Sequence, residues 1–315
     1  MRIAILQFSP RLSEVESNIA RANSILAAAD LQNLDLLVSF ELALTGYNHT
    51  RETILPLLEP ADGGPTATWA KLNARKYSCI VSVGYPEIDP NSESGDTEDA
   101  KAYNSTITVD ASGQVLAHYR KTHLYYTDEP WAQEGPDKWL VRSLPIAHDS
   151  GNPETKAAFG ICMDLNPYKF TAPWTAYEFS THALEAGAEI IVLSMAWLTS
   201  LPADEVKDKP TEPDLDTFSY WLNRLMPLMK GDRDVIVVCA NRSGEEPGKN
   251  PSGQDEEGVR YAGTSWIGRI GKGRVDVWGV LGRGQEDWLV VDTAEEPIGS
   301  YRLSGNGGDG NGDAG

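Results

Sequence analysis

Short apolar runs alternate with segments of helical periodicity along most of this chain. Arg2–Phe8 is an apolar run of strand length, and the segment Glu14–Ala29 that follows places apolar residues at every third or fourth position, which is the spacing of an amphipathic helix. Asp35–Phe40 is largely apolar, as expected of a strand buried on both faces. The same patterns predict further strands at Ser78–Gly84, Glu189–Ser194 and Val235–Ala240, and helices at Ala67–Arg75, Trp174–Ala188 and Thr217–Met229.

Hairpins interrupt this alternation. Tyr103–Val109 and Gln114–Arg120 both alternate apolar and polar residues, and they flank the turn sequence DASG at Asp110–Gly113, which predicts a β-hairpin. Near the C-terminal end, strands joined by glycine-rich turns are predicted at Tyr261–Arg269, Arg274–Val280 and Trp288–Asp292. Because no linker or internal repeat divides the chain, the pattern predicts one α/β domain with a mixed sheet or two stacked sheets covered by helices.

We expect this domain to span residues 1–303. Residues 304–315 contain mainly Gly, Asn and Asp, a composition that predicts a disordered tail. The polar stretch Asn91–Asp99 is interpreted as a surface loop.

Composition and charge restrict the classes of partner. A net charge of −19 disfavours nucleic-acid binding, because no basic patch easily dominates such a field. No apolar run has the length of a membrane span, and the N-terminal segment turns polar too soon for a signal peptide. The three cysteines, Cys79, Cys162 and Cys239, lack the spacing of a zinc site or a disulfide framework. We therefore expect no membrane partner, no metal, and a location in the cytoplasm, with the nucleus as the alternative.

Three predicted strands each end at one ionisable group, namely Glu41, Lys121 and Cys162. A thiolate attacks acyl carbons well, but a thiol near neutral pH is only slightly ionised. Glu41 can take the thiol proton, while Lys121 and the backbone N–H of Met163 can stabilise an oxyanion. The alternatives are an inert buried cysteine and a cysteine–histidine site, for which His123 is the nearest histidine to Lys121 along the chain.

The segments around these groups, FELALTGY, YRKTHL and GICMD, resemble the three signature motifs of the nitrilase superfamily of carbon-nitrogen hydrolases in order and spacing. The resemblance extends from RIAILQ to the SWIG and WLVVD strands. It implies a single-domain α-β-β-α four-layer sandwich. It also implies a triad with Glu41 as general base, Lys121 as oxyanion stabiliser and Cys162 as nucleophile, which needs neither a metal nor an organic cofactor.

Superfamily members usually carry a second glutamate in the loop after the lysine. Glu129, in TDEPWAQEG, aligns best with it and would orient the substrate amide and the lysine. Glu134 is the competing position. For either residue, a surface acid without a catalytic role is the alternative.

At a finer level, LYYTDEPWAQEGP and GICMDLNPYKFTAPW resemble the fungal protein N-terminal asparagine and glutamine amidohydrolases. The run Asn166–Phe170 stands where an Arg-Phe-Pro run is usual in the superfamily. This resemblance implies an enzyme that converts N-terminal Asn or Gln of proteins or peptides into Asp or Glu in the N-degron pathway. Ammonia would be released through a thioester on the cysteine.

A substrate with a free α-amino group requires an acidic side chain near the pocket mouth. The candidates are Asp164, Asp128 and Glu134, although Asp164 is equally suited to bracing the loop of the nucleophile. Met195 and Trp197, at the end of a strand that follows the cysteine strand, are predicted to wall the pocket. An ordinary core position is the alternative for both.

Two other functions remain open. A small-molecule ω-amidase or N-carbamoyl amino acid hydrolase would be expected to place Arg or Lys for a substrate carboxylate, and Lys169 is the basic residue beside these motifs. A catalytically silent binding module on the same fold is the alternative of another class, but it has no need of an intact triad. A monomer and a homodimer are both compatible with the sequence.

Overall fold

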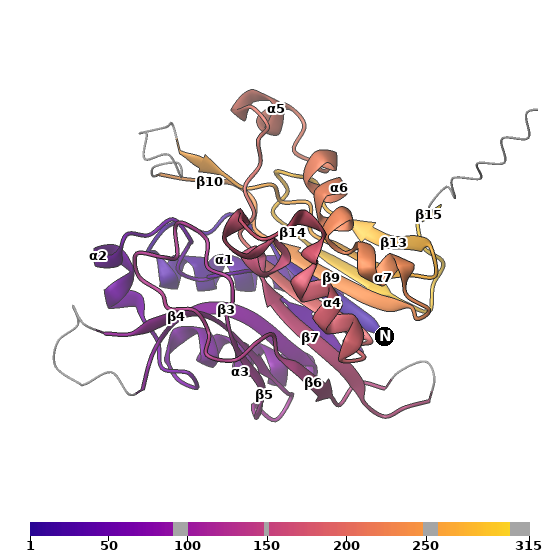
Figure 1. Ribbon diagram of the computed structural model, residues 1–315. Coiled ribbons are helices and arrows are strands. Elements are labelled where there is room, and N and C mark those ends of the chain that lie inside the picture. The colour runs from indigo at the N-terminus through magenta and orange to yellow at the C-terminus, as the bar shows by residue number, and fades with distance from the viewer. Residues whose placement is uncertain (91–99, 148–150, 248–257, 303–315) are drawn as a thin grey trace, which may run out of the picture.

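The structure is a computed structural model that describes residues 1–90, 100–147, 151–247 and 258–302. The predictions for Asn91–Asp99 and for residues 304–315 lie outside the described residues, so the domain boundary at residue 303 stays a prediction. Within the described ranges, two large β-sheets stack against each other and helices cover their outer faces (Figure 1).

The six-stranded sheet has the strand order β14-β1-β2-β3-β4-β5. Its strands are β1 (Arg2–Gln7), β2 (Leu36–Val38), β3 (Ile80–Ile88), β4 (Ala102–Val109), β5 (Val115–Arg120) and β14 (Asp287–Asp292). The strands β1, β2 and β3 are parallel, whereas β4, β5 and β14 pair antiparallel with their neighbours. The predicted hairpin is therefore confirmed as β4 and β5.

The seven-stranded sheet has the order β15-β13-β12-β9-β8-β7-β6. Its strands are β6 (Val141–Leu144), β7 (Thr155–Ile161), β8 (Ile190–Met195), β9 (Val235–Asn241), β12 (Trp266–Gly271), β13 (Arg274–Val280) and β15 (Gly299–Arg302). The central strands β7, β8 and β9 are parallel. A separate short ribbon pairs β10 (Glu245–Glu246) with β11 (Val259–Arg260).

Helices form the two outer layers. On the six-stranded sheet, α1 (Val15–Ala27) packs on β1 and β14, and α3 (Gly64–Tyr77) packs on β3 and β4. On the other sheet, α4 (Glu178–Glu185) and α6 (Leu215–Arg224) pack with α7 (Met226–Lys230), which contacts β12. The remaining helices are α2 (Arg51–Ile54), α5 (Ala203–Asp208), η1 (Leu55–Leu57), η2 (Cys162–Leu165), η3 (Tyr168–Phe170) and η4 (Trp174–Ala176).

Several predicted elements differ from the observed ones. The helix predicted at Trp174–Ala188 begins only with α4, because Tyr177 has a φ of 48°, a left-handed backbone that a helix does not continue. The helix predicted at Thr217–Met229 is divided into α6 and α7, because Pro227 lacks the N–H that a continuous helix requires. The strand predicted at Tyr261–Arg269 begins later, with β12. The strands β6 and β15 and the helix α5 were not predicted.

The stacking brings the ends of the parallel strands of both sheets together. The hydroxyl of Ser194, in β8, donates a hydrogen bond to the carbonyl of Ser39, just after β2, at 3.1 Å. Because β2 leads to Glu41 and β7, the neighbour of β8, leads to Cys162, this contact places the base and the thiol at the same edge of the sandwich. Such strand ends are where α/β proteins carry their binding sites.

Candidate active site

Lys121 lies between two carboxylates at this edge. Its Nζ is 2.6 Å from Oε1 of Glu41 and 2.5 Å from Oδ2 of Asp128. The amide of Asn104, in β4, donates to both carboxylates, at 2.7 Å to Glu41 and 3.0 Å to Asp128. All four side chains are buried. The geometry therefore fixes one ammonium group and two carboxylates against one another, away from solvent.

Burial sets the proton affinities of this cluster. It raises the pKa of Glu41 to about 7, with a further increase from Asp128 and an opposing decrease from Lys121. For Lys121, burial disfavours the charge, but Asp128 and Glu41 outweigh it and raise the pKa of the ammonium. The Oε2 atom of Glu41 has no hydrogen-bond partner within the described residues. Glu41 is therefore a base of near-neutral pKa with one free oxygen.

Cys162 follows β7 directly and opens the 3₁₀ turn η2. Its φ of 37° is in the left-handed region, which is strained for a residue with a side chain and is found at functional turns. Burial and Glu41 raise the pKa of its thiol, while Lys121 and a hydrogen bond from the Ala196 backbone lower it. The thiol is therefore neutral at rest and needs a base to become a nucleophile.

Asp164 braces the turn that carries the cysteine. Its carboxylate accepts hydrogen bonds from the backbone N–H groups of Ile161, Thr122 and His123 and from the hydroxyl of Tyr119, at 2.7–3.1 Å. Burial raises the pKa of Asp164 despite these bonds. The residue joins the loop after Lys121 to the loop of Cys162.

A cavity of about 380 Å³ opens onto the thiol. Its wall includes four aromatic side chains and one carboxylate residue among the described residues. The lining residues are Tyr125, Cys162, Met163, Asn166, Phe170, Ala196, Trp197, Leu198, Ser200, Asp216, Thr217 and Tyr220. Trp197, which the sequence assigned to the pocket wall, lines this cavity, and so does Met163, the expected oxyanion donor. Met195 does not line this cavity and is fully buried in the core.

The structure separates the two neighbouring acids of the loop after Lys121. Glu129 is exposed, and the carboxylate that reaches Lys121 belongs to Asp128. A turn causes this, since the N–H of Asp128 donates to the carbonyl of Tyr125 and the N–H of Tyr125 donates to Asp128 Oδ2. The carboxylate in contact with Lys121 is therefore Asp128 and not Glu129, and Asp128 is not free to bind a substrate amine.

Glu134 lies outside the cavity wall. Its carboxylate accepts a hydrogen bond from the hydroxyl of Tyr168 at 2.7 Å and lies 3.9 Å from Nζ of Lys169. All three groups are at least partly exposed. Of the acids that the sequence proposed for the substrate amine, Asp128, Asp164 and Glu134 are thus each engaged with other groups of the protein.

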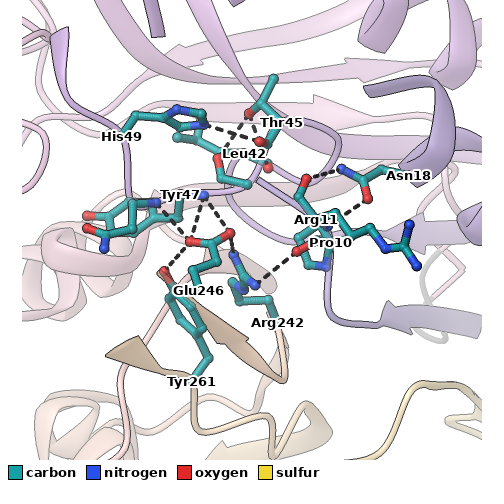
Figure 2. Close-up of polar contacts among 12 residues, drawn as sticks. Pro10, Arg11, Asn18, Leu42, Thr45, Tyr47, His49, Arg242, Glu246 and Tyr261 are labelled. Carbon is teal, nitrogen blue, oxygen red and sulfur yellow. Dashed lines mark hydrogen bonds and ion pairs between the residues drawn. The ribbon is translucent and has the colours of Figure 1, made fainter. Parts of the chain in front are cut away.

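A buried ion pair supports the loop that carries Glu41. Glu246 pairs with Arg242, and it accepts hydrogen bonds from the hydroxyl of Tyr261 at 2.6 Å and from the N–H groups of Tyr47 and Asn48 at 2.9–3.2 Å (Figure 2). Burial disfavours the charge of Glu246, but Arg242 and the hydrogen bonds outweigh it and lower its pKa. Because the Tyr47 ring lies 5.6 Å from Nζ of Lys121, this pair supports both the base and the lysine.

Sequence reasoning missed Asn104, the Ala196 backbone and Asp216. Asn104 and Asp216 belong to no motif, and their positions result from strand pairing and helix packing. Within the described ranges, no group of three or more His, Cys, Asp or Glu side chains is arranged to hold a metal ion. No helix in that part of the chain is long and apolar enough to cross a membrane.

Comparison with known proteins identifies the family. The model of the carbon-nitrogen hydrolase family matches residues 2–169, a range that contains Glu41, Lys121 and Cys162. The protein N-terminal amidase of Schizosaccharomyces pombe is 34% identical over 312 residues, which are 94% of this chain and 100% of that protein. The chain belongs to the carbon-nitrogen hydrolase family. This carbon-nitrogen hydrolase is therefore an amidohydrolase, as the resemblance of its three motifs predicted.

Further similarities agree with this assignment. The protein N-terminal amidase of Saccharomyces cerevisiae is 35% identical over 226 residues, which are 67% of this chain and 47% of that longer protein. A solved N-terminal amidase with a Gln-Gly peptide superimposes with a TM-score of 0.78 at 23% identity, over 92% of this chain and 96% of that chain. The predicted four-layer α-β-β-α sandwich is confirmed by this likeness of fold.

Proposed function

We propose that this hydrolase removes the side-chain amide of an N-terminal asparagine or glutamine of a protein or peptide, giving aspartate or glutamate and ammonia. The observation that carries the proposal is the position of the Cys162 thiol, which lines an open cavity while Glu41 and Lys121 are buried at the same edge of the sandwich. Similarity to the S. pombe protein N-terminal amidase along the whole of that protein supports this substrate class.

In the acylation step, Glu41 takes the proton of the Cys162 thiol and the sulfur attacks the amide carbon. The new oxyanion is stabilised by the ammonium of Lys121 and the backbone N–H of Met163. Its collapse breaks the carbon–nitrogen bond, and the proton held by Glu41 passes to the leaving nitrogen. Ammonia departs, and the acyl group stays on the sulfur as a thioester.

In the second step, Glu41 takes a proton from water and the hydroxide attacks the thioester. The carbon–sulfur bond breaks, the proton returns to the thiolate, and the product leaves with a carboxyl group in place of its amide. Asp128 holds Lys121 charged and oriented through both steps. This role suits Asp128 better than Glu129, which is exposed.

The three cysteines are free thiols, which fits a reducing compartment. We place the reaction in the cytoplasm, where new protein N-termini are generated. An oligomeric partner is not required by the proposed chemistry, because all groups of the site belong to one chain.

The test is ammonia release from short peptides that begin with Asn or Gln. Copies with an acetylated α-amino group, free α-ketoglutaramate and N-carbamoyl amino acids serve as competing substrates, and Cys162→Ala serves as the inactive enzyme. The proposal predicts turnover of the free-amine peptides alone, abolished by Cys162→Ala. Turnover of the small acids without turnover of the peptides would overturn the substrate assignment and leave the triad in place.

A further inference from the structure

A substrate with a protonated α-amino group needs a counter-charge close to the reacting amide. In an N-terminal Asn or Gln only a few bonds separate the ammonium from the amide carbon, so the acid must lie on the wall of the cavity that contains Cys162. Asp128 and Asp164 are buried and bonded to other groups, and Glu134 is paired with Tyr168 outside the wall. None of these three is available for the amine.

Asp216 meets the requirement. It lines the same cavity as the Cys162 thiol and is the one carboxylate residue of its described wall. It is exposed, and no hydrogen bond or ion pair joins its side chain to another described residue. It also lies in the first turn of α6.

The helix that carries Asp216 is tied to the turn of the nucleophile. The hydroxyl of Tyr220 donates to Asn166 at 2.6 Å, and the guanidinium of Arg224 donates to the carbonyl of Leu165 at 2.9 Å. At its start, the Asp214 carboxylate caps the helix through the N–H of Thr217 at 3.0 Å. Because η2 and α6 are bonded to each other, the position of Asp216 relative to the thiol is fixed.

Aromatic rings complete the environment of a cation. Trp197 and Tyr220 both line the cavity, with ring centroids 5.3 Å apart, and Tyr125 lies on the wall as well. Electron-rich ring faces attract an ammonium group. The wall thus combines one unpaired carboxylate with several rings and carries no Lys or Arg among its described residues.

We propose that Asp216 is the residue that binds the α-ammonium group of the substrate and thereby restricts the hydrolase to free N-termini. This inference rests on the proposed function. The preference for a free α-amine would then come from α6, which lies outside the three sequence motifs. Asp216 should therefore affect KM more than kcat.

The test compares Asp216→Asn with wild type on two matched substrates, an Asn peptide with a free α-amine and its des-amino analogue, a succinamoyl peptide. Loss of a charge-assisted hydrogen bond predicts a fall of about 10- to 100-fold in kcat/KM for the free-amine peptide, mainly through KM. The des-amino analogue should be an equally poor substrate of both enzymes, so the folding of the variant is checked separately, by labelling of Cys162. Asp216→Glu should retain most of the preference.

Asp208→Asn, in α5, is the matched control, because it removes the same charge from an exposed position outside the cavity wall. Equal preference for the free amine in Asp216→Asn and Asp208→Asn would overturn the assignment of Asp216. If wild type itself fails to prefer the free-amine peptide, the proposed function fails instead, so the two failures are distinguishable. Alkylation of Cys162 by iodoacetamide measures whether the thiol is intact and accessible in each variant without relying on turnover, and we expect wild-type labelling in both.

Discussion

The Nζ atom of Lys121 lies 2.5 Å from the carboxylate of Asp128, while the next residue along the chain, Glu129, is exposed. Two adjacent acids therefore differ completely in environment. The buried one holds the ammonium that faces the reacting centre and raises the pKa of Glu41 through its own negative charge.

Asp128→Asn should lower kcat by up to about 100-fold, because a misplaced lysine no longer stabilises the oxyanion. Steady-state kinetics on an Asn peptide measures the effect. Glu129→Gln is the matched control and should stay close to wild type. A decrease in kcat for Glu129→Gln as large as that for Asp128→Asn would show that Glu129 also contributes to catalysis.

The pH dependence of kcat should report Glu41. Because burial raises its pKa to about 7, and the ionised form is the base that accepts the thiol proton, kcat should rise as the pH increases through about 7. In Asp128→Asn this acidic limb should move to lower pH, since a negative charge that disfavours ionisation of Glu41 has been removed. If kcat rises with an apparent pKa typical of a solvated glutamate, the pKa of about 7 does not govern the reaction. If the apparent pKa is the same in Asp128→Asn as in wild type, it does not belong to Glu41.

Glu246→Ala should destabilise the protein by about 3–5 kcal/mol, because it leaves the Arg242 guanidinium buried without its counter-charge. Chemical denaturation measures the free energy of unfolding. Glu14→Ala is the control, because Glu14 forms an exposed pair with Arg11 and exposed pairs contribute about 1 kcal/mol or less. Similar losses in both variants would show that the buried pair is not a major support of the Glu41 loop.

Gly84→Ala should displace the general base. A Cβ atom at Gly84 would lie 2.7 Å from the Cα of Glu41 and 2.8 Å from the backbone N of Leu42, and overpacking of this kind costs about 1–3 kcal/mol. We expect a lower kcat together with lower stability. Gly63→Ala is the control, because the nearest atom there is 3.5 Å away. Wild-type kcat in Gly84→Ala would show that the Glu41 loop tolerates displacement.

Periodicity predicted most of the fold, because the buried strands and amphipathic helices each repeat a local pattern. The triad was predictable because each of its groups directly follows a strand or lies three residues beyond one. The choice between Asp128 and Glu129 was not, because a single turn around Tyr125 decides which carboxylate points inward. Asp216 gave no local signal either, since its place on the cavity wall depends on the packing of α6 against the turn after Cys162.

The covalent role of Cys162 is tested most directly by rapid acid quenching of the enzyme during turnover of a Gln peptide, followed by mass spectrometry of the fragment that contains Cys162. We predict a glutamyl-peptide thioester on this cysteine, formed as ammonia is released and absent with the N-acetylated peptide. Continued ammonia release by Cys162→Ala, with no adduct on Cys162 in wild type, would contradict a mechanism in which Cys162 is the nucleophile.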